Sequence, residues 1–149
     1  MPAPTAHHCT DIRLRNRLDE LDRLHAFVAQ FSSTSGLSTE IAFALTLAIE
    51  ELVTNVILHG YEDAAEHAIL VSLSLEAGTI VVALEDDGRS FDPTQTPAVD
   101  LSLDPQQREI GGLGLHFVRR TMDEMTYHRS GNRNHLLMKK RIGETGGRR

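Results

Sequence analysis

The segment from Ser38 to His59 carries the pattern that most constrains the fold, a long apolar stripe at helical spacing. Its apolar residues recur three or four positions apart and so share one face of a helix. They are Ile41, Leu45, Ala48, Leu52 and Val56. Ser38 is a suitable N-cap, and Gly60 stands where a left-handed C-terminal cap is expected. The pattern predicts a long, well-buried helix over residues 38–59.

Strands and two further helices are predicted on either side of this helix. Alternation of apolar and polar residues, or short runs of Val, Ile and Leu, indicates strands. The predicted strands are residues 11–15, 69–76 and 79–85, a strand that begins near Met125, and residues 136–142. Ala77-Gly78 fits a tight turn between two antiparallel strands. The other predicted helices cover residues 18–31 and 113–122, and the proline-containing segment 88–110 is interpreted as a binding loop or lid.

The length of 149 residues is that of one domain, and 40% hydrophobic with 24% charged residues is ordinary for a soluble protein. A net charge of -6 argues against nucleic acid as a partner. Cys9 is the only cysteine, which fits a reducing compartment. The apolar run from Ile41 to Ile49 is too short to span a bilayer. We therefore expect a cytoplasmic domain over residues 10–142, no membrane partner, and flexible termini at 1–9 and 143–149.

Glu51 and Asn55 form the first of three polar islands that could carry chemistry. Residues four apart on a helix lie about 40 degrees apart around its axis, so these two side chains share a face that Glu50 does not. A carboxylate can take a proton, and a carboxamide oxygen suits Mg²⁺. The pair fits phosphoryl chemistry, and a solvated helix face fits the same spacing.

The second island is Asp86-Asp87-Gly88, which follows a strand of mainly apolar residues. Asp86 is suited to accept a hydrogen bond from an exocyclic amine such as that of adenine, and Gly88 lets another group approach the backbone. The same three residues are also common turn chemistry. Asp87 is interpreted as a turn residue.

The third island, Gly111-Gly112-Leu113-Gly114, precedes an apolar helix. Free amides at a helix start favour an anionic ligand. The glycines match neither the Walker pattern nor a dinucleotide fingerprint, and a hinge or helix entry is the alternative. Arg108 is the only basic residue between Pro93 and Ile110, where it could hold a phosphate or be a solvated loop charge.

Taken in order, the three islands resemble the GHKL ATPase superfamily. Within it they are most similar to the anti-sigma-factor serine/threonine kinases of bacterial partner-switching systems. The resemblance extends over about residues 10–141. It implies an α/β (α+β) two-layer sandwich, in which helices cover one face of a mixed, mainly antiparallel sheet.

The resemblance also implies a role for each island. Glu51 would be the general base that activates the hydroxyl of a partner's Ser or Thr, and Asn55 would be the Mg²⁺ ligand. Asp86 would read the adenine amine, with Gly88 beside it. The remaining nucleotide contacts would be Arg108, Gly112, Leu113, Gly114 and Leu115. Asn134 and His135 stand where many family members have a Thr near adenine.

The implied cofactors are therefore ATP and Mg²⁺. The implied partners are an anti-sigma antagonist, which is phosphorylated and so released, and a sigma factor or other regulator. Members of this family commonly form homodimers.

Three alternatives remain at this point. The chain could be a catalytically silent nucleotide-binding module that sequesters a partner, although an intact Glu51 argues against it. A histidine kinase fragment is disfavoured, because no helix pair with a phospho-accepting His precedes the domain. A purely structural domain would make three ordered motifs a coincidence.

Overall fold

The computed structural model describes residues 8–95 and 112–143. Its strands form one sheet in the order β1-β2-β3-β5-β4, and each neighbouring pair is antiparallel. The strands are β1 (His8–Arg15), β2 (Ala68–Glu76), β3 (Thr79–Asp86), β4 (Glu124–Ser130) and β5 (Arg133–Arg141). The expected two-layer sandwich is confirmed. In the described residues its sheet is wholly antiparallel, where the resemblance had implied a mixed one.

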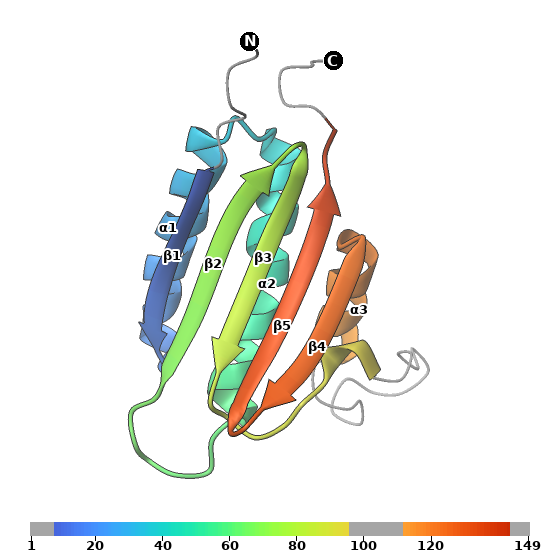
Figure 1. The fold of residues 1–149 in the computed structure, drawn as a ribbon. Helices are drawn as coiled ribbons and strands as arrows, with labels where there is room; N and C mark the ends of the chain where they lie inside the picture. Colours follow the sequence, from blue (N-terminus) through green and yellow to red (C-terminus); the bar gives the residue numbers. More distant parts are fainter. Residues whose placement is uncertain (1–7, 96–111, 144–149) are drawn as a thin grey trace.

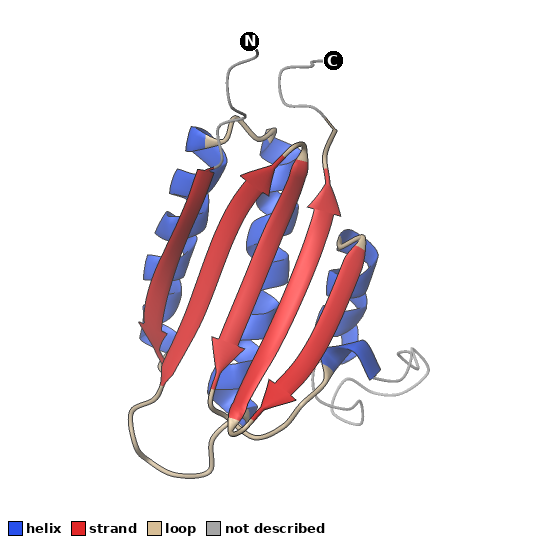
Figure 2. Ribbon diagram, viewed as in Figure 1, coloured by secondary structure: helices blue, strands red, loops and turns tan. Residues whose placement is uncertain are grey.

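The helices all cover the same face of this sheet (Figures 1 and 2). They are α1 (Leu21–Thr34), α2 (Thr39–His59) and α3 (Gly112–Thr121). Short 3-10 turns, η1 (Leu18–Glu20) and η2 (Pro93–Gln95), precede α1 and follow β3. The central helix α2 packs against both α1 and α3. It runs behind the middle of the sheet, between α1 and α3 (Figure 1).

The ends of α2 agree with the sequence at one terminus and differ at the other. Ser38 caps the helix, with its Oγ accepting a hydrogen bond from the backbone N–H of Ile41 at 3.2 Å. Gly60 is not left-handed, since its φ is -81°, so that prediction is wrong. A side chain at Gly60 would instead collide with the carbonyl oxygen of Val56, 2.6 Å from where its Cβ would lie. Glycine is therefore required here for close packing, not for an unusual backbone angle.

Other boundaries differ from the sequence prediction by a few residues at most. β1 begins at His8 and includes Cys9, because its pairing with β2 continues beyond the apolar residues. β5 begins at Arg133, three residues before the predicted start at Leu136. Leu18 lies in η1, not in α1, and is 49% exposed. In each strand the backbone ladder extends into polar residues, which composition alone does not reveal.

The tight turn between β2 and β3 is confirmed. Ala77 and Gly78 have φ values of 50° and 79°, the left-handed pair that matches the twist of a two-residue hairpin. This turn fixes the register that places Ile69 opposite Asp86 at the far end of the hairpin.

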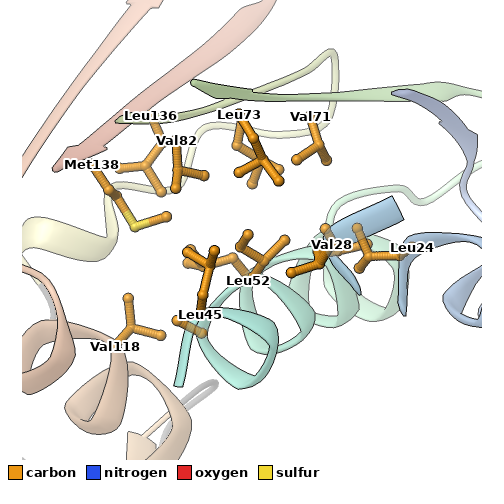
Figure 3. Packing of buried hydrophobic residues seen from close by; sticks show 14 of the residues in the cluster. Leu24, Val28, Leu45, Leu52, Val71, Leu73, Val82, Val118, Leu136 and Met138 are labelled. Atoms are coloured by element: carbon orange, nitrogen blue, oxygen red, sulfur yellow. The ribbon is translucent and has the colours of Figure 1, made fainter. Parts of the chain in front are cut away.

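The core consists mainly of aliphatic side chains, with Phe31 as its buried aromatic residue, and it lies between the helices and the sheet (Figure 3). Leu45 and Leu52 of α2 face Leu73 and Val82 from the sheet, and Val118 of α3 approaches from the side (Figure 3). All of them are at most 4% exposed. The side chains on the helix-covered face therefore supply the packing that holds the two layers together.

Helix α2 is also long and apolar enough to cross a membrane, with a mean hydropathy of 1.9 over its most apolar window. The run of Ile41 to Ile49 had suggested otherwise. The buried side chains of α2 belong to the core between the helices and the sheet. The polar residues Glu50, Glu51 and Asn55 of the same helix are only partly buried. These contacts are those of a central core helix.

Removing core volume at Leu73 tests this arrangement. Leu73 is fully buried on the helix-covered face, whereas Leu137 of β5 is 38% exposed on the open face. Leu73→Ala is expected to lower the free energy of unfolding by about 2–5 kcal/mol, because it leaves a cavity. Leu137→Ala is the matched control, with an expected loss of about 0.5 kcal/mol. Urea unfolding measures both, and equal losses would show that the open face is packed in solution.

Candidate functional site

A pocket lies where the C-terminal half of α2 meets the ends of β3 and β5, and it encloses about 600 Å³ when the space open to solvent is included. Its walls come from α2, from the loop after β3 and from the strands β3, β4 and β5. The lining residues are Leu52, Asn55, Val56, His59, Gly60, Leu84, Asp86, Arg89, Phe91, Pro93, Tyr127, Asn134 and Leu136.

Asp86 is the buried carboxylate of this pocket, at 5% exposure. It is the last residue of β3, where the register places it opposite Asn134 of β5. Its Oδ1 accepts hydrogen bonds from the backbone N–H of Gly88 at 2.8 Å and from Asn134 Nδ2 at 2.9 Å. Within the described residues no protein group donates to Oδ2. One carboxylate oxygen is thus held by the protein, and the other is left to accept from a ligand.

Gly88 lies against Gly60, so the loop after β3 touches the end of α2. The N–H of Arg89 donates to the carbonyl oxygen of Gly60 at 2.8 Å. A Cβ on Gly88 would lie 2.9 Å from that oxygen and 3.0 Å from Asp86 Oδ1. Glycine is needed here because the two chain segments approach too closely for a side chain.

Glu51 and Asn55 lie on one face of α2, as their spacing predicts. Asn55 Nδ2 donates to Glu51 Oε2 at 3.0 Å, and Asn55 also lines the pocket. The Asn55 carboxamide oxygen therefore remains available to a cation. Burial raises the pKa of Glu51, the charge of Glu50 adds to the increase, and the hydrogen bond from Asn55 opposes it. The result is a carboxylate with more affinity for a proton than an ordinary glutamate.

The start of α3 brings the third island against the first. A Cβ on Gly114 would overlap the Glu51 carboxylate, so a side chain at position 114 would require Glu51 to turn away from its present position. Gly112 and Leu113 belong to the first turn of α3. Leu115 is 1% exposed and packs in the core, outside the pocket lining. Arg108 and Gly111 fall outside the described residues.

Asn134 is a site residue that the family resemblance placed near adenine without giving it a role. It is 7% exposed and lies at the centre of a hydrogen-bond network. Besides Asp86, its Nδ2 donates to the carbonyl oxygens of Gly88 and Arg89 at 3.3 and 3.0 Å. Its Oδ1 accepts from Tyr127 Oη at 2.5 Å and from Arg129 Nη1 at 2.9 Å. Only the strand register, which pairs it with Asp86, could have revealed this role.

Asp87 is more than the turn residue that the sequence indicated. Its carboxylate contacts His67 Nδ1 at 3.2 Å, and His67 Nε2 contacts Asp63 at 2.8 Å. Asp63 and then Asp87 raise the pKa of His67. Tyr61 stacks on the His67 ring at a centroid distance of 4.2 Å. The segment between α2 and β2 is thereby fastened to the loop beside the pocket.

The polar side chains of this site fit a nucleotide that is bound together with a hard cation such as Mg²⁺. Asp86 offers a free acceptor oxygen deep in the pocket, while Asn55 and Glu51 lie towards the α3 start. Within the described residues no group of three or more His, Cys, Asp or Glu side chains could hold a metal by itself. A cation here would share its coordination with ligand oxygens and water, which is the usual arrangement for Mg²⁺.

Comparisons with known proteins agree with this geometry. Residues 14–140 match the histidine kinase-like ATPase domain family. The serine/threonine-protein kinase BtrW of Bordetella bronchiseptica is 32% identical over 101 residues, which are 68% of this chain and 71% of BtrW. An anti-sigma F factor of Anoxybacillus flavithermus is 29% identical over 103 residues, 69% of this chain and 68% of that protein.

A solved structure shows the same fold. It is the crystal structure of the RsbU and RsbW domains of Rv1364c from Mycobacterium tuberculosis, with a TM-score of 0.66 at 18% identity. The match covers 94% of this chain and 33% of that longer chain. The resemblance drawn from the three islands is confirmed. The chain belongs to the histidine kinase-like ATPase domain family, in the group that contains serine/threonine kinases and anti-sigma F factors.

Proposed function

We propose that this chain is an ATP- and Mg²⁺-dependent serine/threonine protein kinase that regulates a partner by binding and phosphorylation. Its acceptor would be an anti-sigma antagonist, and its regulated partner a sigma factor or another regulator. The names of its relatives, a serine/threonine kinase and an anti-sigma F factor, support this proposal. The cytoplasm is the compartment in which such partners would be met.

The observation that carries the proposal is the convergence of the three islands. Asp86 and Asn55 line one pocket, Asn55 is hydrogen-bonded to Glu51, and Glu51 lies against Gly114. An acceptor for an exocyclic amine, a cation ligand, a base and a helix start are thus joined in a continuous row. A nucleoside triphosphate presents matching groups in the same order, from the amine of its nucleobase to its phosphates.

In the proposed reaction the chain mainly positions its reactants and handles one proton. Asp86 would hold the nucleobase, and Glu51 would take the proton from the acceptor hydroxyl as that oxygen attacks the γ-phosphorus. The bond from this phosphorus to the β–γ bridging oxygen breaks in the same step, and ADP leaves with the bond's electron pair. The hydrogen bond from Asn55 keeps the Glu51 carboxylate directed along the helix. Asn55 would also hold Mg²⁺, which supplies positive charge to the phosphate oxygens. Gly112 and Leu113 contribute backbone amides at the start of α3, where partial positive charge favours an anion.

The phosphate placed on the acceptor explains how a partner would be released. A phosphoserine adds about two negative charges at neutral pH. Repulsion and desolvation at a packed interface would then favour dissociation. The exchange of partners would then follow from the changed charge of one of them.

Glu51→Gln separates binding from chemistry. Gln cannot accept the proton, so we expect phosphoryl transfer to fall by about 10²–10⁴-fold while nucleotide binding remains. Transfer from γ-labelled ATP to a panel of purified anti-sigma antagonists measures the first, and calorimetry measures the second. Glu50→Gln is the matched control, because Glu50 contacts His25 and not Asn55. Transfer at the wild-type rate by Glu51→Gln would disprove the base assignment.

Asn55→Ala tests the cation site. Loss of the carboxamide oxygen should abolish Mg²⁺-dependent ATP binding, since alanine offers no ligand to the cation. Calorimetric titration with ATP, with and without Mg²⁺, measures the effect. Asn132→Ala, the same change in the exposed β4–β5 turn, serves as the control. Equal Mg²⁺ dependence in Asn55→Ala and the wild type would place the cation elsewhere.

The acid side of the pH–rate profile should report the pKa of Glu51. A general base works only when deprotonated, and burial raises the pKa of this carboxyl. Transfer should therefore fail, as pH decreases, at a higher pH than an ordinary glutamate would give. Glu50→Gln removes a neighbouring negative charge and should move this limb to lower pH. If the acid limb of Glu50→Gln lies at the same pH as that of the wild type, the limb reports the titration of a group other than Glu51.

A further inference from the structure

We propose that Asn134 is a positioning residue that makes the site selective for purines carrying a 6-amino group. It would act through Asp86, by fixing which carboxylate oxygen faces the base. This inference rests on the proposed function, because it concerns the nucleotide of the same site. It assigns to a residue of β5 a part in choosing the substrate.

Chemistry alone determines how the Asn134 amide is oriented. Arg129 carries only donors, so the atom at 2.9 Å from its Nη1 must be the carboxamide oxygen. The other end of the amide faces Asp86 Oδ1 and the carbonyl oxygens of Gly88 and Arg89, all of which are acceptors. A flipped amide would place an oxygen against these three acceptors. The NH₂ group is therefore held towards Asp86.

The remaining contacts prevent the amide from turning. Tyr127 Oη donates to Asn134 Oδ1, and Ser90 Oγ lies 3.3 Å from the Tyr127 hydroxyl. Arg129 also donates to the carbonyl oxygen of Gly88 at 3.0 Å. Asn134 is almost fully buried, so water does not replace these partners readily. The network fastens β4, β5 and the loop after β3 around one side chain.

The consequence for Asp86 is that its two oxygens differ. Oδ1 already accepts from Gly88 and Asn134, and both bonds would break if the carboxylate rotated. Oδ2 is then the acceptor offered to a ligand. A 6-amino group can donate to it, whereas the 6-oxo group of guanine would place an acceptor against an acceptor. When the buried Oδ2 is left without a donor, binding loses free energy, and this loss makes the site prefer a 6-amino purine to a 6-oxo purine.

The test compares ATP with purine riboside triphosphate, which lacks only the 6-amino group. Calorimetry with Mg²⁺ gives the ratio of the two dissociation constants for the wild type, Asn134→Val and Asn134→Thr. Val and Thr have the same shape, but only Thr has a hydroxyl that can donate to Asp86. Asn132→Ala is the control, because it removes the same amide from an exposed position.

We expect the wild type and Asn132→Ala to favour ATP by about 10- to 100-fold, the range for a hydrogen bond to a charged group. Asn134→Val should bind the two nucleotides almost equally, with its affinity for purine riboside triphosphate unchanged. Asn134→Thr should recover part of the preference. For an accepted protein substrate, Asn134→Val should raise the KM for ATP and leave kcat unchanged. Asn134→Ala, which also lacks a donor, provides the same test if Asn134→Val does not fold.

Two results would overturn the inference alone. One is an undiminished preference for ATP in Asn134→Val, and the other is a parallel loss of affinity for both nucleotides, which would mean a structural role only. A wild-type protein that binds neither nucleotide would instead overturn the proposed function, and the inference with it. The two failures are thus distinguishable.

Discussion

The burial of α2 against the sheet is the constraint on which the site depends. Leu45, Ile49 and Leu52 commit one side of the helix to the core, and this sets its rotation about its own axis. Once that rotation is set, Glu51 and Asn55 can only lie beside the pocket and the start of α3. The apolar residues therefore determine the chemistry indirectly, by deciding where the polar residues of the same helix are directed.

Much of this arrangement was predictable from the sequence, because periodicity reports burial. The α2 stripe, the β2–β3 hairpin and the helices on one face follow from spacings that burial imposes on apolar residues. Glu51 and Asn55 were predictable for the same reason, since they share the face that the stripe leaves free. That they lie beside Asp86 and Gly114 required the family resemblance, because no local pattern brings together residues so far apart in the chain.

What escaped prediction depends on pairing between distant segments. The first residues of β5 are polar, so nothing local marks Asn134 as part of a strand. Its partnership with Asp86 exists only because the register aligns the two positions. Gly60 was assigned a left-handed angle from its place after a helix, whereas the carbonyl oxygen of Val56 is what excludes a side chain there. The pairing register of distant strands carries information that a single sequence does not display.

The contact between Gly114 and the Glu51 carboxylate links two positions that are far apart in the chain. A larger residue at 114 fits only if the side chain at 51 becomes shorter or turns away. In descendants of this chain the two positions should consequently change together. A homologue with a bulky residue in place of Gly114 would have to hold the carboxylate in another orientation or lose it, so this one glycine shows whether a relative can keep the carboxylate where it lies here.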